Sequence, residues 1–161
     1  MYKGQHISVV IPCHNEEEGV RFVLSDIPAV VDEVIIVDND STDRTAEVAR
    51  SLGAVVIHEK RKGYGAAYKT GLRNATGDII VTMDGDGTYP RSFIPVLVEI
   101  MLEEDWDFIT CDRTGHKTPR AGTALRVLGN SILNWAMFLL FLVKLRDSQS
   151  GMWVFKRSLL P

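Results

Sequence analysis

The sequence predicts an α/β fold with a mostly parallel sheet flanked by helices, and three observations lead to this prediction. Short apolar, β-branched runs recur along the 161 residues. They do not alternate with polar residues, which is typical of strands buried on both faces. Helix-like stretches of roughly ten residues separate them, and polar residues follow several runs directly. Strand and helix therefore alternate, as they do in parallel sheets.

The predicted strands are the apolar runs, at Ile7–Ile11, Val34–Val37, Ala54–Ile57, Ile79–Met83 and, more weakly, Phe108–Cys111. The predicted helices lie between them, at Glu16–Ser25, Asp43–Leu52, Tyr64–Asn74 and Ser92–Glu103. Asp43–Leu52 has the clearest signals, because Ser41-Thr42-Asp43 offers N-caps and Gly53 stands where a left-handed residue ends a helix. Val154-Phe155 looks like the start of a further strand near the end of the chain. We expect one domain over residues 1–161 that lacks a C-terminal portion.

Composition excludes some classes of protein. Hydrophobic residues make up 45% and charged residues 24% of the chain, which is ordinary for a globular domain. A formal net charge of −3 gives no support to a nucleic-acid partner. Cys13 and Cys111 have no zinc-like spacing and are expected to be reduced thiols. No apolar signal-peptide core precedes the first strand, so we expect a cytoplasmic protein.

One apolar stretch needs a separate explanation. Val127–Val143 contains no formal charge, but it falls just short of the length that spans a bilayer, and Asn130, Ser131 and Asn134 interrupt it. The expected helix, Ala121–Val143, could lie on a membrane surface. A core helix, or one that packs against a missing C-terminal portion, explains the pattern equally well.

Ligands of open parallel sheets bind beyond the carboxyl ends of the strands. Polar segments follow the predicted strands at Pro12–Glu16, Asp38–Asp40 and Asp84–Asp86. The Asp84-Gly85-Asp86 segment places two carboxylates one residue apart, and Mg²⁺ takes such oxygen ligands while keeping room for substrate phosphates. A solvated Asp-Gly turn is the alternative. An EF-hand is excluded, because the sixth position counted from Asp38 or from Asp84 is not glycine.

A glycine turn precedes the predicted helix Tyr64–Asn74. Its basic residues, Lys60, Arg61 and Lys62, and the following Gly63-Tyr64-Gly65 suit a phosphate at a helix N-terminus. A solvated basic loop remains the alternative. A dinucleotide fingerprint is excluded, because Tyr68 replaces the third small residue and the segment does not follow the first strand.

Six motifs, taken in order, resemble glycosyltransferase family 2, and more narrowly its dolichol-phosphate mannose synthase and polyprenyl-phosphate glucosyltransferase branch. They are Ile11-Pro12-x-x-Asn15-Glu16-Glu17, Val37-Asp38-x-x-Ser41-x-Asp43, Gly63-x-Gly65, Gly77-Asp78, Met83-Asp84-Gly85-Asp86 and Asp147-x-x-Ser150-Gly151. The resemblance covers about Ile7–Arg157. It implies a GT-A fold, inversion at the anomeric carbon, and a UDP- or GDP-sugar donor.

The resemblance also implies roles for single residues. Asp84 and Asp86 would bind Mg²⁺ or Mn²⁺ and the donor diphosphate, and Arg113 and Arg126 would meet the acceptor phosphate. These four are the candidate catalytic residues. The candidate donor-binding residues are Pro12, Asn15, Glu17, Asp38, Asp40, Lys62, Gly65, Asp84, Gly85, Asp86, Ser150 and Gly151. Of these, Ser150 and Gly151 match the acceptor-side loop of the family.

The acceptor is expected to be a polyprenyl phosphate. A phosphate is already an anion, whereas a sugar hydroxyl needs a general base, and no Asp or Glu lies between Pro119 and Lys144. Such an acceptor would place the apolar helix on the cytoplasmic face of a membrane. Thr88 and Tyr89 stand where mannose synthases commonly have Gln and His, so their sugar specificity does not transfer.

Three other functions stay open. A glycosyltransferase acting on a sugar hydroxyl would use Asp147 as the nearest carboxylate. A sugar-nucleotide transferase usually has a glycine-rich loop after its first strand, which Pro12-Cys13-His14-Asn15 does not supply. A truncated domain could also bind nucleotide or membrane without catalysis.

Overall fold

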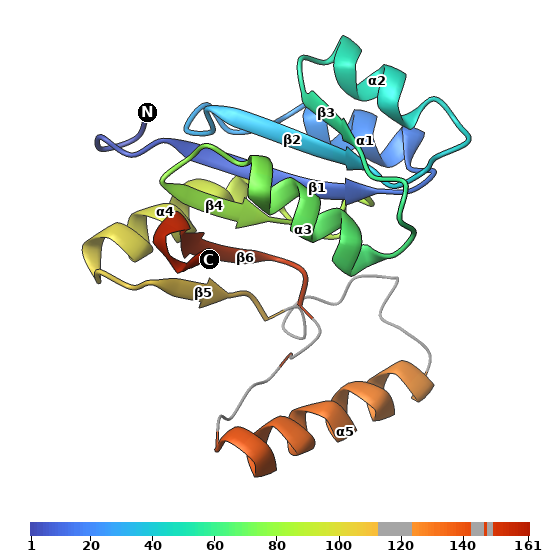
Figure 1. Ribbon diagram of the computed structural model, residues 1–161. Helices are drawn as coiled ribbons and strands as arrows, with labels where there is room; N and C mark the ends of the chain where they lie inside the picture. The colour runs from blue at the N-terminus through green and yellow to red at the C-terminus, as the bar shows by residue number, and fades with distance from the viewer. Residues whose placement is uncertain (113–123, 143–146, 148–149) are drawn as a thin grey trace. The chain divides into compact units, whose positions relative to one another are not determined.

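The computed structural model describes residues 1–112, 124–142, 147 and 150–161, which form two compact units. The first unit, Met1–Ile109 with Met152–Pro161, is built on a six-stranded sheet in the order β3-β2-β1-β4-β6-β5 (Figure 1). The strands are β1 (Ile7–Cys13), β2 (Glu33–Asp38), β3 (Val55–His58), β4 (Ile79–Thr82), β5 (Phe108–Thr110) and β6 (Trp153–Lys156). β1 to β4 run parallel and β6 is antiparallel to β4. The predicted α/β class is confirmed.

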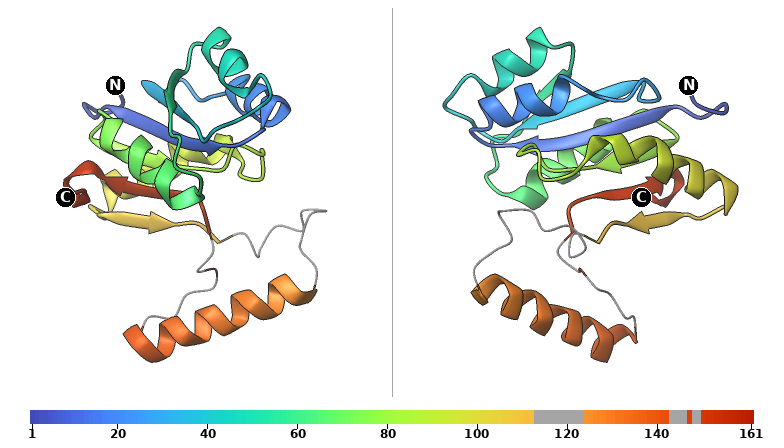
Figure 2. Two further views of the ribbon diagram at one scale, coloured as in Figure 1. Left: turned by 45° about the vertical axis from the view of Figure 1, so that its right-hand side comes forward. Right: turned by 180° about the vertical axis from the view of Figure 1, so that it is seen from behind.

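Helices cover both faces of this sheet (Figures 1 and 2). They are α1 (Glu17–Leu24), α2 (Thr45–Ser51), α3 (Tyr64–Asn74) and α4 (Ile94–Glu103), with short 3₁₀ turns at η1 (Arg91–Phe93) and η2 (Arg157–Leu159). α3 lies on one face, and α1 and α4 lie on the other. α1, α2 and α3 each follow a parallel strand, so their N-termini lie near the carboxyl ends of the strands.

The packing of α3 fixes where its first residue lies. Val10, Ile35 and Val37 of the sheet form a buried cluster with Ala67 of α3. At Gly71 a Cβ atom would lie 2.4 Å from Val10 Cγ1, so only glycine allows this helix to approach the sheet so closely. The N-terminus of α3 is therefore held close to the carboxyl ends of β1 and β2.

The end of β1 differs from the predicted end of the first strand. The first strand was predicted to end at Ile11, directly before Pro12, yet β1 continues through Pro12 to Cys13. Residues of a parallel strand bond alternately to the two neighbouring strands, and Val10 and Pro12 face β4. Because β4 ends at Thr82, opposite Val10, the missing N–H of Pro12 removes no ladder hydrogen bond.

The predicted start of α2 is wrong and its predicted end is confirmed. The helix begins at Thr45, two residues later than predicted, and its N-cap residue is Arg44, which makes no side-chain capping hydrogen bond. Asp43 instead precedes the N-cap, and its Oδ1 accepts a hydrogen bond from Thr45 N at 3.0 Å. Gly53 has a φ of 86°, the left-handed conformation expected at that helix end.

The second unit, Thr110–Gly151, contains α5 (Ala124–Phe141). The predicted helix at Ala121–Val143 is confirmed over these residues, and positions 121–123 and 143 lie outside the described residues. Large apolar side chains are exposed along its later half, at Ile132, Leu133, Trp135, Phe138, Leu139, Leu140 and Phe141. In the parts of the chain that the structure describes, no helix is long and apolar enough to cross a membrane. The expectation of one domain without its C-terminal portion stays a prediction.

Candidate functional site

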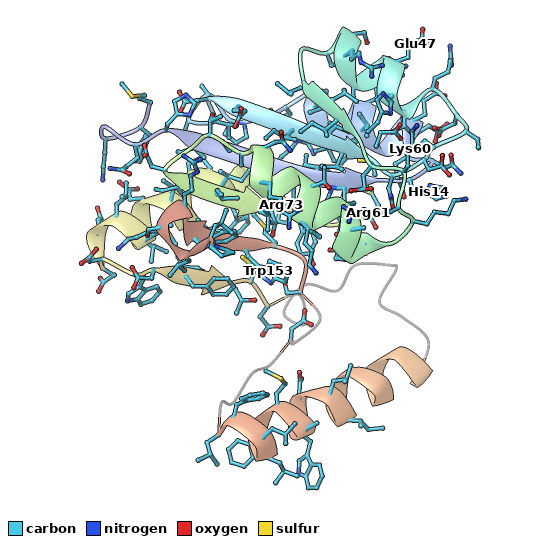
Figure 3. The ribbon with its side chains drawn as sticks, viewed as in Figure 1. His14, Glu47, Lys60, Arg61, Arg73 and Trp153 are labelled. Carbon is cyan, nitrogen blue, oxygen red and sulfur yellow. The ribbon has the colours of Figure 1, made fainter. Side chains whose placement is uncertain are left out.

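The sheet register brings the predicted polar segments together at one edge. Cys13 pairs with Asp38, so β1 and β2 end side by side. Met83, just past β4, donates its N–H to Val10 O at 3.2 Å, which places Asp84 at the same edge. His14, Lys60 and Arg61 are found at this end of the sheet in Figure 3.

A cleft of about 300 Å³ opens at this edge. Its lining residues come from the ends of β1 and β2 and from the start of α3, and they are Pro12, Cys13, His14, Asn39, Lys62, Gly63, Tyr64 and Ala67. Of the predicted donor-binding residues, Pro12 and Lys62 line this cleft. The cleft therefore joins the proline segment of the first strand to the glycine turn.

Asn39 connects two of the segments at the cleft through its side-chain hydrogen bonds. Its Nδ2 donates to the carbonyl oxygens of Glu59 and Arg61, each at 2.8 Å, and its Oδ1 accepts from Gly63 N at 2.9 Å. Its own carbonyl contacts His14 Nδ1 at 2.8 Å. Only 7% of the residue is exposed. The residue ties the segment 59–63 to the end of β2.

The predicted basic segment divides into residues with different partners. Arg61 binds Glu59 through both its Nε and a terminal nitrogen, at 3.0 and 2.7 Å. This pairing, with a hydrogen bond from Thr70, holds the pKa of Glu59 well below its usual range. Lys62 lies 3.3 Å from Asp40, which has a left-handed φ of 62°. Arg61 therefore anchors the segment, and Lys62 is the basic side chain that lines the cleft.

The two predicted metal ligands differ in their surroundings. Asp84 is half-buried, and its Oδ1 accepts a hydrogen bond from Tyr64 OH at 2.7 Å. Asp86 is exposed, and its Oδ1 accepts from Thr88 N at 2.9 Å. Between them, a Cβ atom on Gly85 would lie 2.6 Å from Cys13 Sγ, so glycine is required for the turn to approach β1.

Two carboxylates are a suitable donor set for a hard divalent cation that keeps its other positions for phosphate oxygens and water. No group of three or more His, Cys, Asp and Glu side chains within the described ranges could hold a metal ion. Asp84 and Asp86 therefore suit a cation whose other ligands come from a diphosphate and water. They are too few to enclose a cation with protein ligands alone.

The other predicted donor-binding residues at this edge have partners within the chain. Asp38 is buried, and its carboxylate accepts from Ser41 N at 3.2 Å and lies 2.8 Å from His58 Nδ1. Asn15, at a left-handed φ of 56°, accepts from Thr42 N at 2.8 Å. Glu17 pairs with Arg44 at 2.6 Å. These contacts shape the β2–α2 loop beside the cleft.

The remaining predicted residues do not all belong to the described part of the first unit. Gly65 is exposed within the first turn of α3, and nothing lies within 4 Å of a Cβ placed there, so the turn conformation depends on Gly63, with a φ of 124°. Ser150 and Gly151 are buried residues of the second unit. Arg113 and the side chain of Arg126 lie outside the described residues.

Six residues that line the cleft were not among the predicted site residues: Cys13, His14, Asn39, Gly63, Tyr64 and Ala67. Asn39 stands between the predicted Asp38 and Asp40, and its place directly after a strand was the signal that could have selected it. Tyr64 carried no such signal, because its contact with Asp84 joins residues twenty positions apart on different elements.

A mostly parallel sheet with a cleft at the carboxyl ends of its strands is the architecture of nucleotide-binding α/β proteins. The chain belongs to the family described as glycosyl transferase family 2, whose profile matches residues 8–160. The resemblance found in the sequence motifs is thereby confirmed. So is the GT-A fold, because solved glucosyl-3-phosphoglycerate synthase structures match 98% of this chain.

Two relatives that are named as glycosyltransferases or hexose transferases support the same family. An uncharacterised glycosyltransferase of Mycobacterium tuberculosis is 38% identical over 83% of this chain and 60% of its own. A dolichyl-phosphate hexose transferase of Haloferax volcanii is 33% identical over 99% of this chain and 70% of its own. The chain therefore spans 60% of the length of the mycobacterial relative.

Solved structures of glucosyl-3-phosphoglycerate synthase from Mycobacterium tuberculosis are also similar. The complex with phosphoglyceric acid has a TM-score of 0.78 at 29% identity, covering 98% of this chain and 58% of that one. The complex with Mn²⁺, UDP and glucosyl-3-phosphoglycerate has a TM-score of 0.75 at 29% identity, with the same coverage.

Proposed function

We propose that this chain is the donor-binding part of an inverting glycosyltransferase that moves a sugar from a UDP- or GDP-sugar to a polyprenyl phosphate. The observation that carries the proposal is the cleft at the carboxyl edge, which lies between the first strand and the glycine turn, with Tyr64 joining it to Asp84. The solved synthase with Mn²⁺ and UDP supports a nucleotide donor and a divalent cation.

In this proposal the cleft takes the nucleoside, and the diphosphate extends toward Asp84 and Asp86. A Mg²⁺ or Mn²⁺ ion supplies a Lewis acid that stabilises the negative charge of the departing nucleoside diphosphate. Lys62 adds a positive charge at the cleft. Gly63 N cannot serve as a further donor, because it is bonded to Asn39.

A phosphate acceptor suits the residues that the chain offers. A phosphate oxygen attacks the anomeric carbon without losing a proton, so no general base is required. The Haloferax volcanii relative, named a dolichyl-phosphate hexose transferase, supports a polyprenyl phosphate. Arg113 and Arg126 are proposed to neutralise the acceptor phosphate, and Ser150 and Gly151 to lie beside it.

The second candidate acceptor is a phosphorylated hydroxy acid. The synthase that superposes on this chain was solved with phosphoglyceric acid, and it is named after the product glucosyl-3-phosphoglycerate. Such an acceptor reacts through a hydroxyl group and would need a base. A hydroxyl acceptor must therefore lose a proton during the transfer, whereas a phosphate acceptor does not.

Membrane contact is proposed for α5. Trp135 is 66% exposed, Leu140 is 74% exposed and Phe141 is 62% exposed, an apolar surface of the kind that a membrane interface covers. A peripheral position on the cytoplasmic face would give the site access to a lipid-linked acceptor.

Turnover separates these functions. Release of UDP or GDP is measured from a panel of nucleotide sugars, with and without Mn²⁺, in the presence of a polyprenyl phosphate or of phosphoglyceric acid. We expect release that requires both Mn²⁺ and the polyprenyl phosphate. Release with phosphoglyceric acid alone would transfer the assignment to the second acceptor. Donor binding without release, also in a longer chain, would favour a non-catalytic domain.

Membrane binding is tested by sedimentation with vesicles of phosphatidylcholine and phosphatidylglycerol. We expect the chain to sediment with them, and Phe141→Glu to reduce the bound fraction. Trp106→Glu is the matched control, because Trp106 is 50% exposed in the first unit. Equal loss in both variants, or no sedimentation of the unchanged chain, would contradict the proposed membrane contact.

A further inference from the structure

Tyr64 connects the cleft to the carboxylate pair. It is the first residue of α3, lines the cleft and donates its hydroxyl proton to Asp84 Oδ1 at 2.7 Å. The Tyr68 hydroxyl, one helical turn away, lies 3.2 Å from the Tyr64 hydroxyl. A phenol has one proton, and the carboxylate is both the closer and the charged acceptor. The proton of Tyr64 therefore belongs to the bond with Asp84.

The backbone beneath Tyr64 is held on both sides. Gly63 adopts a φ of 124° and donates its N–H to Asn39, while its carbonyl accepts from Ala67 N at 3.2 Å. The rings of Tyr64 and Tyr68 pack edge to face with centroids 4.6 Å apart. The hydroxyl is thus presented to Asp84 from a fixed helix start and a packed ring.

The hydroxyl is a hydrogen-bond donor in the neutral pH range, because an ordinary tyrosine phenol keeps its proton there.

We propose that Tyr64 is a positioning residue, which orients the Asp84 carboxylate for the divalent cation of the donor complex. This inference rests on the proposed function of the same site. A carboxylate has about four lone-pair positions, so a hydrogen bond at Oδ1 leaves it able to coordinate a cation. Carboxylates that bind metals are usually hydrogen-bonded in turn, and loss of such a partner lowers metal affinity by roughly 10–100-fold.

The test is the Mn²⁺ affinity of Tyr64→Phe. Free Mn²⁺ is followed by electron paramagnetic resonance during titration in the presence of UDP, and in a parallel series with GDP. We expect Mn²⁺ to bind about tenfold more weakly, at the lower end of the range for such partners. The thermal midpoint of unfolding is measured alongside, and the variant should stay folded because Tyr64 is 52% exposed and keeps its ring.

The matched control is Tyr2→Phe. The Tyr2 hydroxyl also donates to a carboxylate, Glu99 Oε1 at 3.3 Å. Tyr2 precedes β1 and Glu99 belongs to α4, so this pair lies outside the proposed site. This variant should keep the full Mn²⁺ affinity.

The possible results separate the two proposals. Equal Mn²⁺ affinity in Tyr64→Phe and the unchanged chain overturns the positioning role alone, and tighter binding overturns it by showing that the hydroxyl competes with the cation. If the unchanged chain binds no Mn²⁺ with either nucleotide, the proposed function fails and the positioning role fails with it.

Discussion

Asn39→Ala is the substitution that tests the architecture of the cleft most severely. It removes the side-chain hydrogen bonds to Glu59 O, Arg61 O and Gly63 N, at 2.8, 2.8 and 2.9 Å. A typical hydrogen bond contributes about 1 kcal/mol net, so the free energy of unfolding should fall by about 3 kcal/mol. For a chain of this size, that loss lowers the thermal midpoint by roughly 6–12 °C.

The assay is urea unfolding followed by circular dichroism, with Asn74→Ala as the matched control. Asn74 is exposed and makes one side-chain hydrogen bond, to Thr70 O at 2.8 Å, so its removal should change the free energy of unfolding by less than about 0.5 kcal/mol. An equally small effect of Asn39→Ala would refute the reasoning, since it would show that segment 59–63 does not depend on this side chain.

Two further predictions concern packing and pH. Gly85→Ala should destabilise the chain by about 1–3 kcal/mol in urea unfolding, because its Cβ would lie 2.6 Å from Cys13 Sγ. Adding Cys13→Ala to this variant should recover part of the lost free energy of unfolding. If nothing is recovered, the steric clash with Cys13 is not the cause of the loss. Because Arg61 and Thr70 lower the pKa of Glu59 below its ordinary 4.5, ionised Glu59 stabilises the fold above that pH and its contribution is lost as the pH falls below it. The urea midpoint should therefore fall less steeply with acidification in Glu59→Gln than in the unchanged chain, and parallel curves would contradict the assignment.

The sheet could be predicted from the sequence because its central strands, β1, β2 and β4, are mostly buried and leave continuous apolar runs. Helix α3 was predicted with its observed bounds, Tyr64–Asn74. The end of β1 could not be predicted, because the effect of Pro12 depends on where the neighbouring strand β4 ends. The residues around Pro12 give no information on the end of β4.

The sequence indicated which polar segments lie at one edge of the sheet, but it did not indicate the hydrogen bonds and ion pairs of their side chains. Residues after strand ends were correctly expected to meet at one edge, as Cys13 and Asp38 do. The sequence could not distinguish Arg61, which is bound to Glu59, from Lys62, which lines the cleft. Charge is visible in a sequence, whereas the partner that neutralises it depends on the fold.

The central claim is that Asp84 and Asp86 hold a divalent cation against a donor diphosphate. Its most direct test is calorimetric titration of UDP and GDP, with and without Mn²⁺, into the unchanged chain, Asp86→Ala and Asp26→Ala. Asp26 is the control, because its carboxylate is 80% exposed and lies beyond the far end of α1. We predict that Mn²⁺ strengthens binding of one nucleotide in the unchanged chain and in Asp26→Ala, and that Asp86→Ala loses this gain while its thermal midpoint is kept. The same Mn²⁺-dependent affinity in Asp86→Ala would contradict the account.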